Sequence, residues 1–110
     1  MGVNNKADIN FLTSYLEKSI GKGLLRISIM ILLNNIRCHG YKIYKVLKQR
    51  VYYNLSLSTL YTILKELKNL DIIVRVNDTY YLSERGKHLL SILKRRYPKI
   101  ISSLEEMLKS

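Results

Sequence analysis

The sequence predicts a mainly α-helical protein with one small β-hairpin, and three of its features support this fold class. Only five glycines and one proline occur among 110 residues, so the chain has few positions at which to turn. Apolar residues recur every three or four positions along most of the chain, as they do on one side of a helix, and alternate only between residues 72 and 82. The length and a hydrophobic content of 47% suit a single domain with its own core.

The N-terminal third predicts two helices with a turn between them. Between residues 9 and 20 the apolar positions follow helical spacing, at Ile9, Leu12, Leu16 and Ile20. We expect this first helix to end at Gly21-Lys22-Gly23, because two glycines in three residues favour a turn. A second helix, from Leu24 to about Arg37, is apolar on nearly every side, and one subunit of this size can hardly cover it. We therefore expect a dimer.

The middle of the chain predicts a helix-turn-helix. A helix from Tyr41 to about Val51 carries lysines on its outer side, and a short turn leads from it to Ser56, a favourable N-cap residue. The next helix, about Leu57 to Asn69, has one apolar face and one face of small polar residues, a tyrosine and a lysine. Two helices joined by a short turn, the second opening with small polar residues, are typical of the helix-turn-helix.

Two strands and a final helix complete the predicted fold. The β-rich runs Ile72–Val76 and Thr79–Leu82 are separated only by Asn77-Asp78, which suits a two-residue hairpin and, after a helix-turn-helix, makes a wing. Ser83 can cap a long helix from about Glu84 to Lys109, which Pro98 either kinks or divides in two.

The predicted organisation is one domain with two parts. Residues 1–83 form a winged helix-turn-helix with an N-terminal helix, and residues 84–110 form a dimerisation helix that packs on the same domain. Apolar positions in the last helix recur in steps of three and four, as in a short heptad seam, which a monomer would leave exposed. The predicted dimer interface comprises Ile27, Ile31, Leu90, Leu93, Tyr97, Ile100, Leu104 and Met107.

The charge balance indicates a polyanionic partner. Lysine and arginine together number 19 against 8 acidic residues, and the formal net charge is +11. No acidic residue lies between Glu17 and Glu66, whereas an ordinary solvated surface mixes both signs. Double-stranded DNA is the favoured partner, because the helix at 57–69 has the shape that fits a groove. The predicted DNA-contacting residues are Lys42, Lys45, Ser56, Ser58, Thr59, Tyr61, Thr62, Lys65 and Arg75.

Other classes of function have less support in the sequence. The chain has no nucleophile elbow, phosphate loop or zinc-protease motif, so we expect no enzyme, and Cys38 is the only cysteine, so we expect no metal or other cofactor. The N-terminus lacks the apolar core of a signal peptide, and no apolar run approaches the ~20 residues of a membrane span, so we expect a soluble, cytoplasmic protein. The alternative from another class is a winged-helix module that binds a partner protein. RNA binding is disfavoured because aromatic residues do not cluster with the basic ones.

Several segments in order resemble the PadR family of winged-helix transcriptional regulators over about residues 18–108. The resemblance is carried by Leu24–Leu33, His39–Tyr44, Leu55-Ser56 with Thr59–Tyr61, and Tyr80–Gly86. The resemblance implies a homodimeric DNA-binding regulator that acts as a repressor and places its two recognition helices in successive major grooves. The chain is similar to the short subfamily, in which the last helix dimerises against the partner's first helix. In that subfamily a pore between the last helices takes planar aromatic compounds, which here would stack on Tyr97.

The sequence departs from the family pattern at three positions. Asp71 stands where the family has a glycine of positive φ after the recognition helix. The tip of the wing is Asn77-Asp78 rather than basic, which leaves Arg75 as the wing residue expected to contact DNA. Pro98 lies within the dimerisation helix and is expected to change the angle at which the subunits pair.

Overall fold

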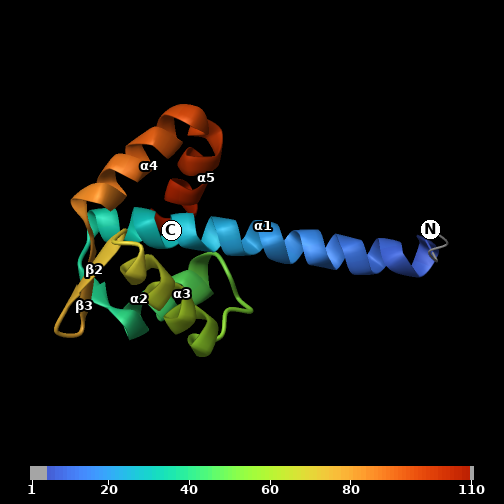
Figure 1. The fold of residues 1–110 in the computed structure, drawn as a ribbon, viewed down its shortest axis with the longest axis horizontal. Helices are drawn as coiled ribbons and strands as arrows, with labels where there is room; N and C mark the ends of the chain where they lie inside the picture. Colours follow the sequence, from blue (N-terminus) through green and yellow to red (C-terminus); the bar gives the residue numbers. More distant parts are fainter. Residues whose placement is uncertain (1–4, 110) are drawn as a thin grey trace.

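The structure is a computed structural model that describes residues 5–109. These residues form five α-helices and a small antiparallel sheet of three strands, which confirms the predicted fold class (Figure 1). In chain order the elements are α1 (Asn5–Asn35), β1 (Cys38–His39), α2 (Gly40–Arg50), α3 (Leu57–Asn69), β2 (Ile73–Val76), β3 (Thr79–Leu82), α4 (Glu84–Arg96) and α5 (Pro98–Lys109).

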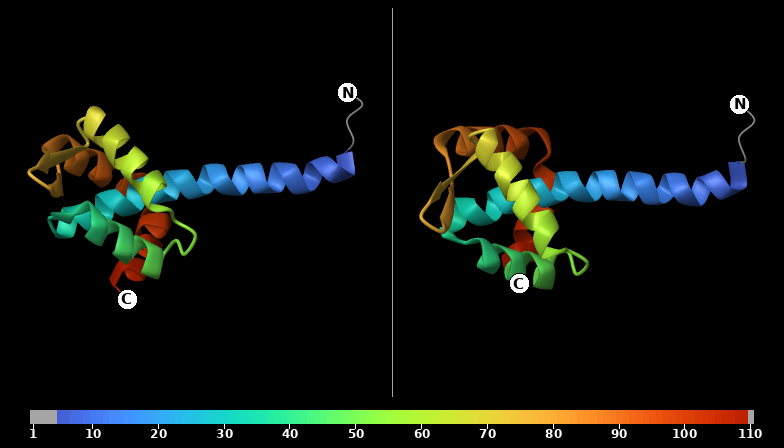
Figure 2. Two further views of the ribbon diagram at one scale, coloured as in Figure 1. Left: turned by 90° about the horizontal axis from the view of Figure 1, so that it is seen from below. Right: turned by 60° about the horizontal axis from the view of Figure 1, so that its bottom comes forward.

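Helix α1 is one continuous helix of 31 residues, so the predicted turn at Gly21-Lys22-Gly23 is wrong. Neither Gly21 nor Gly23 has a positive φ, and both continue the helix. A glycine inside a helix costs only about 1 kcal/mol relative to alanine, which the apolar segment that follows it can offset by packing. The N-terminal half of α1 projects from the rest of the protein with no neighbouring element along it (Figures 1 and 2).

The C-terminal half of α1 lies at the centre of the core. In Figure 1, α2, α3 and the β2–β3 hairpin lie on one side of it and α4 and α5 on the other, and α1 packs against α2, α4, α5 and β3. This arrangement explains why residues 24–33 are apolar on nearly every side. The least exposed core residues come from α1, α2, α3, β2 and α5, and include Ile29, Ile31, Ile43, Leu47, Leu60, Leu64, Ile73 and Ile101.

The predicted hairpin is present, with one strand more than expected beside it. Strand β3 pairs with β2 in antiparallel register, with Arg75 opposite Tyr80, and Asn77 at the tip adopts a φ of 58°. The two residues of β1 pair with the other edge of β3, with Cys38 opposite Tyr80, so that the sheet order is β1-β3-β2. The sheet therefore joins the end of α1 to the wing.

Of the two outcomes that the sequence left open at Pro98, the structure has the division: residues 84–109 form two helices, α4 and α5. Tyr97 leaves the helical region with a φ of −131° and a ψ of 58°, and α5 then turns back to contact α1 and α2. Lys94 of α4 pairs with Glu105 of α5 at 3.2 Å, and the Arg50 guanidinium donates to the Leu108 carbonyl. Helices α4 and α5 thus form a helical hairpin on α1.

This hairpin buries part of the apolar seam that was expected to lie exposed on a monomer. Leu90 of α4 and Leu104 of α5, like Ile31 of α1, are buried within the chain, because α4 and α5 pack against each other and against α1. Ile27 and Leu93 are half-buried. Only three of the predicted dimer-interface residues keep large exposed side chains, and these are Tyr97, Ile100 and Met107.

Ser83 connects the hairpin to α4 and is expected to matter for stability. Its hydroxyl oxygen accepts from the Gly86 backbone N–H at 2.9 Å, and it lies 2.6 Å from the Asp71 carbonyl oxygen, to which it can donate. Replacing an N-cap serine by alanine removes such bonds, so Ser83→Ala should lower the free energy of unfolding by about 1 to 2 kcal/mol. Urea unfolding measures this. Ser91→Ala is the control, because Ser91 bonds only the His88 carbonyl on an exposed face, and it should change stability by less than about 0.5 kcal/mol.

Candidate nucleic-acid interface

Helix α3 has the two faces that its sequence predicted. Leu60, Ile63, Leu64 and Leu67 are buried against the core. The solvent face carries exposed side chains within reach of a partner, at Ser58, Tyr61, Thr62, Lys65, Lys68 and Asn69. Lys68 was not among the predicted contact residues, although its place three positions after Lys65 puts it on the same face.

The start of α3 is fixed by its own side chains. The Ser56 oxygen accepts from the Thr59 backbone N–H at 3.1 Å, so Ser56 is the N-cap that its position predicted. The Ser56 hydroxyl also donates to the Thr59 hydroxyl at 2.8 Å. Thr59 lines a cavity of about 280 Å³ between α1 and α3, and Ser58, Thr62, Lys22, Arg26 and Glu66 line it as well. The exposed hydroxyl side chains of Ser58, Thr59 and Thr62 therefore all border the side of α3 that faces α1.

An ion pair fixes α3 against α1. The Arg26 guanidinium donates to both carboxylate oxygens of Glu66, with N–O distances of 2.5 and 3.1 Å. The hydrogen bond from Arg26 lowers the pKa of the Glu66 carboxyl below its ordinary value, and the nearby charges of Arg26 and Lys22 act in the same direction. Sequence patterns did not single out this pair, because its members are 40 positions apart.

The pair gives a pH dependence of known sign. A carboxyl whose pKa is lower in the folded state adds stability above its unfolded pKa of about 4.3, and that increment is lost as the pH falls through the folded pKa. Glu66→Gln should therefore lower stability at pH 7, by less than about 1 kcal/mol because the pair is partly exposed, and the difference from the parent protein should vanish as the pH falls below the folded pKa of this carboxyl. Thermal unfolding across this pH range measures the difference. Arg26→Gln should lower the stability by the same amount. A double variant that loses twice as much stability as either single variant would show that the two residues contribute separately rather than as a pair.

Helix α2 presents lysines together with tyrosine rings. The rings of Tyr41 and Tyr44 stack with centroids 6.0 Å apart, and the Lys45 and Lys48 ammonium groups lie 5.8 and 5.5 Å from their respective ring centroids. Lys42 is also exposed. Because each ring holds a cation near it, these lysines are partly ordered before any partner arrives.

Tyr61 is held by packing and still reaches solvent. A Cβ atom on Gly40 would lie 2.7 Å from the Tyr61 hydroxyl oxygen, so only glycine at the start of α2 leaves room for this ring. The side chain nevertheless remains 42% exposed. Tyr61 therefore packs against the start of α2 and also remains accessible to a partner.

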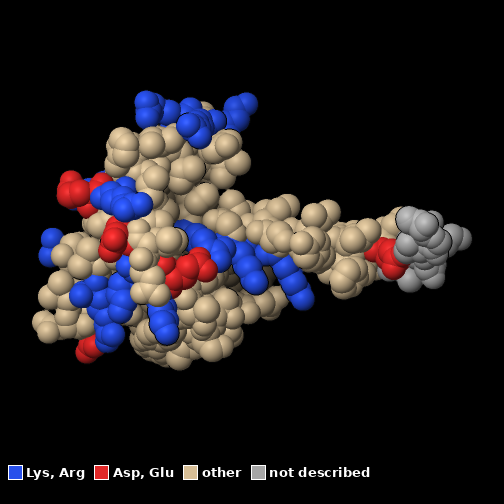
Figure 3. Space-filling model, in the orientation of Figure 1, with Lys and Arg blue, Asp and Glu red and all other residues tan. Residues whose placement is uncertain are grey.

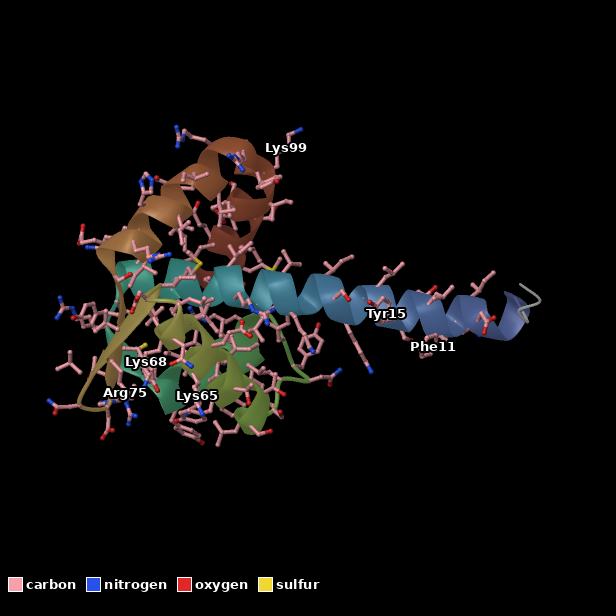
Figure 4. The ribbon with its side chains drawn as sticks, in the orientation of Figure 1. Phe11, Tyr15, Lys65, Lys68, Arg75 and Lys99 are labelled. Carbon is pink, nitrogen blue, oxygen red and sulfur yellow. The ribbon has the colours of Figure 1, made fainter. Side chains whose placement is uncertain are left out.

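Arg75 lies on the wing near the lysines of α3. Lys65, Lys68 and Arg75 occupy the same side of the molecule in Figure 4, and blue side chains gather there in Figure 3. The Arg75 guanidinium pairs with Asp78 at the wing tip at 2.9 Å and lies 5.8 Å from the Tyr80 ring centroid. Asp78 therefore offsets part of the charge that Arg75 presents. On the other side of the sheet, Arg37 covers the Tyr81 ring at 4.4 Å.

Two further kinds of site find no support in residues 5–109. No group of three or more metal-binding side chains comes together there. Within the same residues, none of the helices combines the length and the apolar character that crossing a membrane requires.

Comparisons with known proteins identify the fold. No protein-family model matches the chain, and no curated protein matches it significantly. A solved PadR family transcription regulator from a hypervirulent Clostridium difficile strain matches with 26% identity and a TM-score of 0.59, over 76% of this chain and 97% of that one. A PadR-like transcriptional regulator from Bacillus cereus matches with 16% identity and a TM-score of 0.64, over 81% of this chain and 95% of that one.

The two matched proteins are transcription regulators, which agrees with the expectation that this chain is not an enzyme. They also confirm the resemblance found in the sequence. Over most of its length, the chain has the winged-helix fold of the PadR transcription regulators.

Proposed function

We propose that the protein is a double-stranded DNA-binding transcription regulator that inserts α3 into the major groove. The observation that carries this proposal is the solvent face of α3, which presents polar and basic side chains on the same side of the molecule as Arg75 of the wing. An α-helix fits the major groove, and small polar side chains can bond base edges there. Ser58 and Thr62 are exposed on this face, at the side that borders α1, and are the proposed base contacts.

The cations around α3 have a different role in this proposal. Lys65 and Lys68 lie one and two turns further along the helix, and Lys42, Lys45 and Lys48 follow α2. Lysines at such positions bind phosphates and set the position of the helix without reading the sequence. Ser56 and Thr59 contribute chiefly by ordering the start of α3, and Arg75 contacts the backbone once it leaves Asp78.

The salt dependence of DNA affinity tests the proposed phosphate contacts. Each phosphate contact adds about 0.9 to the slope of log affinity against log salt. Lys65→Ala should therefore weaken binding to all duplexes alike and reduce the slope by about 0.9. Fluorescence anisotropy with duplexes enriched from a random pool measures both. Lys87→Ala is the matched control, because Lys87 lies on α4 and pairs with Glu84, and its slope should equal that of the parent protein.

The same enrichment separates this function from the main alternative. A regulator selects a sequence motif from the pool, whereas a winged-helix module that binds a partner protein selects none. If the variants Lys65→Ala, Lys68→Ala and Thr62→Ala all bound the enriched duplex with the affinity of the parent protein, the assignment of α3 to the groove would be contradicted.

We also propose that the protein acts as a homodimer through the projecting half of α1. Ile9, Leu12, Leu16 and Ile20 share one face of this helix, and all four side chains are exposed. Such a stripe is larger than soluble monomers usually leave uncovered. A second copy running antiparallel can cover it, and the exposed Tyr97, Ile100 and Met107 of the α4–α5 hairpin add apolar area for the same partner.

A repressor role and an aromatic effector complete the proposal taken from the sequence. A dimer that occupies its operator blocks access to the promoter. Tyr97 is 50% exposed, so a planar aromatic compound can stack on its ring, and the neighbouring Arg95 and Arg96 favour an anionic or neutral compound over a cationic one.

A further inference from the structure

Three unpaired cations gather at the tip of the α4–α5 hairpin, far from α3. Arg95 and Arg96 end α4, Lys99 begins α5, and all three side chains are exposed. In Figure 3 the blue side chains at the top of the molecule mark this tip, and Figure 4 labels Lys99 there. Among residues 5–109, Lys94 pairs with Glu105, whereas Arg95, Arg96 and Lys99 form no ion pair.

Helix stability explains why Arg95 and Arg96 lie at this tip, but it does not explain Lys99. Cations in the last turn of a helix interact favourably with its dipole, which suits Arg95 and Arg96. Lys99 lies in the first turn of α5, where the dipole disfavours a cation, and that turn has no acidic residue. Three cations with no opposite charge beside them also repel one another. An anion from outside the chain would relieve both effects.

The position of the tip separates it from the DNA that α3 is proposed to hold. Lys65 lies below α1 in Figure 4 and Lys99 above it, with the whole core between them. The molecule measures 31 Å along its intermediate axis, which is vertical in that view. A straight duplex in contact with α3 therefore does not reach the tip.

We propose that Arg95, Arg96 and Lys99 form a second, sequence-independent binding surface for duplex DNA, so that one protein molecule can hold two DNA segments. The inference rests on the proposed function of α3. Guanidinium groups match pairs of phosphate oxygens with two parallel hydrogen bonds, and such contacts read no sequence.

An anionic membrane fits this tip less well than DNA. A helix that binds a membrane surface needs a broad apolar face beside its basic residues. The apolar faces of α4 and α5 point to the core, where Leu90, Ile101 and Leu104 are buried. Only Tyr97 and Ile100 remain exposed beside the cations, which is too little apolar surface for such binding.

A bridging experiment with the full chain tests the proposal. A duplex enriched from a random pool is fixed to beads and saturated with protein, and a labelled 30-base-pair duplex of mixed sequence is then added at low salt. We expect the parent protein to retain the labelled duplex. The variant R95Q/R96Q/K99Q should retain at least about tenfold less, as removal of about three phosphate contacts predicts, with its affinity for the fixed duplex within twofold. The control R85Q/K87Q/K109Q removes the same charge elsewhere and should bridge like the parent.

The other outcomes overturn the proposal in distinct ways. If the parent protein binds the fixed duplex and retains no second one, the tip does not bind DNA, and the role of α3 stands. If the parent protein binds no duplex at all, the proposed function itself fails. Equal loss in both triple variants would mean that net charge alone is responsible. A tip variant that becomes monomeric in light scattering, or that loses only its binding to phosphatidylglycerol vesicles, would assign the tip to the partner subunit or to lipid.

Discussion

Gly86→Ala should lower the free energy of unfolding by about 3 kcal/mol, at the upper end of what overpacking a core by one methyl group costs. A Cβ atom at this position would lie 2.3 Å from the Ile72 carbonyl oxygen and 2.6 Å from a Leu82 methyl carbon. The carbonyl cannot move aside easily, because it accepts from the Ser83 backbone N–H at 3.0 Å. Helix α4 must therefore shift away from the hairpin, and the packing between them is lost.

Two other glycines provide the control for Gly86. Nothing lies within 4 Å of a Cβ atom built on Gly21 or Gly23, and both lie inside α1. Gly21→Ala and Gly23→Ala should each raise stability by up to about 1 kcal/mol, because alanine favours a helix over glycine. Urea unfolding at one fixed protein concentration compares all three, since a dimer's stability depends on concentration. If Gly86→Ala were as stable as the parent, α4 would have to lie further from the hairpin than it does here.

Leu16→Glu should convert the protein to a monomer and lower its affinity for a two-half-site duplex by at least about 100-fold. Leu16 lies at the middle of the exposed stripe on α1, with 56% of its side chain accessible. A carboxylate in the centre of an apolar interface loses its hydration without gaining a partner. Once the two winged helices are no longer joined, the second half-site contact loses the gain of about 10² to 10⁴ that linkage provides. Light scattering measures the mass and anisotropy the affinity.

Phe11→Glu tests whether the correct face of α1 has been chosen. Phe11 is also exposed, at 67%, but lies on the face that it shares with Tyr15 rather than with Leu16. This variant carries the same new charge on the same helix and should remain dimeric. The reverse pattern, a monomer from Phe11→Glu and a dimer from Leu16→Glu, would move the interface to the aromatic face.

The sequence predicted best those elements whose signals are local. The caps at Ser56 and Ser83, the change from helical to alternating spacing near residue 72, and the short turn before α3 all depend on a few adjacent residues. Asp71 also takes the positive φ, 61°, that the family pattern requires of a glycine there. These features are determined by backbone preferences, which one sequence displays directly.

The elements that were missed depend on contacts between distant parts of the chain. Strand β1 has only two residues and exists because β3 offers it a free edge. The return of α5 onto α1 follows from apolar contacts that spacing within α4 and α5 cannot specify. In the interface, Glu66 was overlooked, and Lys68 could have been found by extending the helical phase from Lys65.

Because α1 is one continuous helix, it connects the proposed dimer contact directly to the core of the winged helix. Residues 5–20 alone span about 24 Å at 1.5 Å per residue. A bend of only 10° at Gly21 and Gly23, where no side chain stiffens the helix, would displace the far end of this arm by about 4 Å. In the dimer the displacement would appear as a change in the distance between the two copies of α3. The stiffness of α1 at these two glycines would then determine how much variation in the distance between operator half-sites the protein tolerates, without any change in the residues that contact DNA.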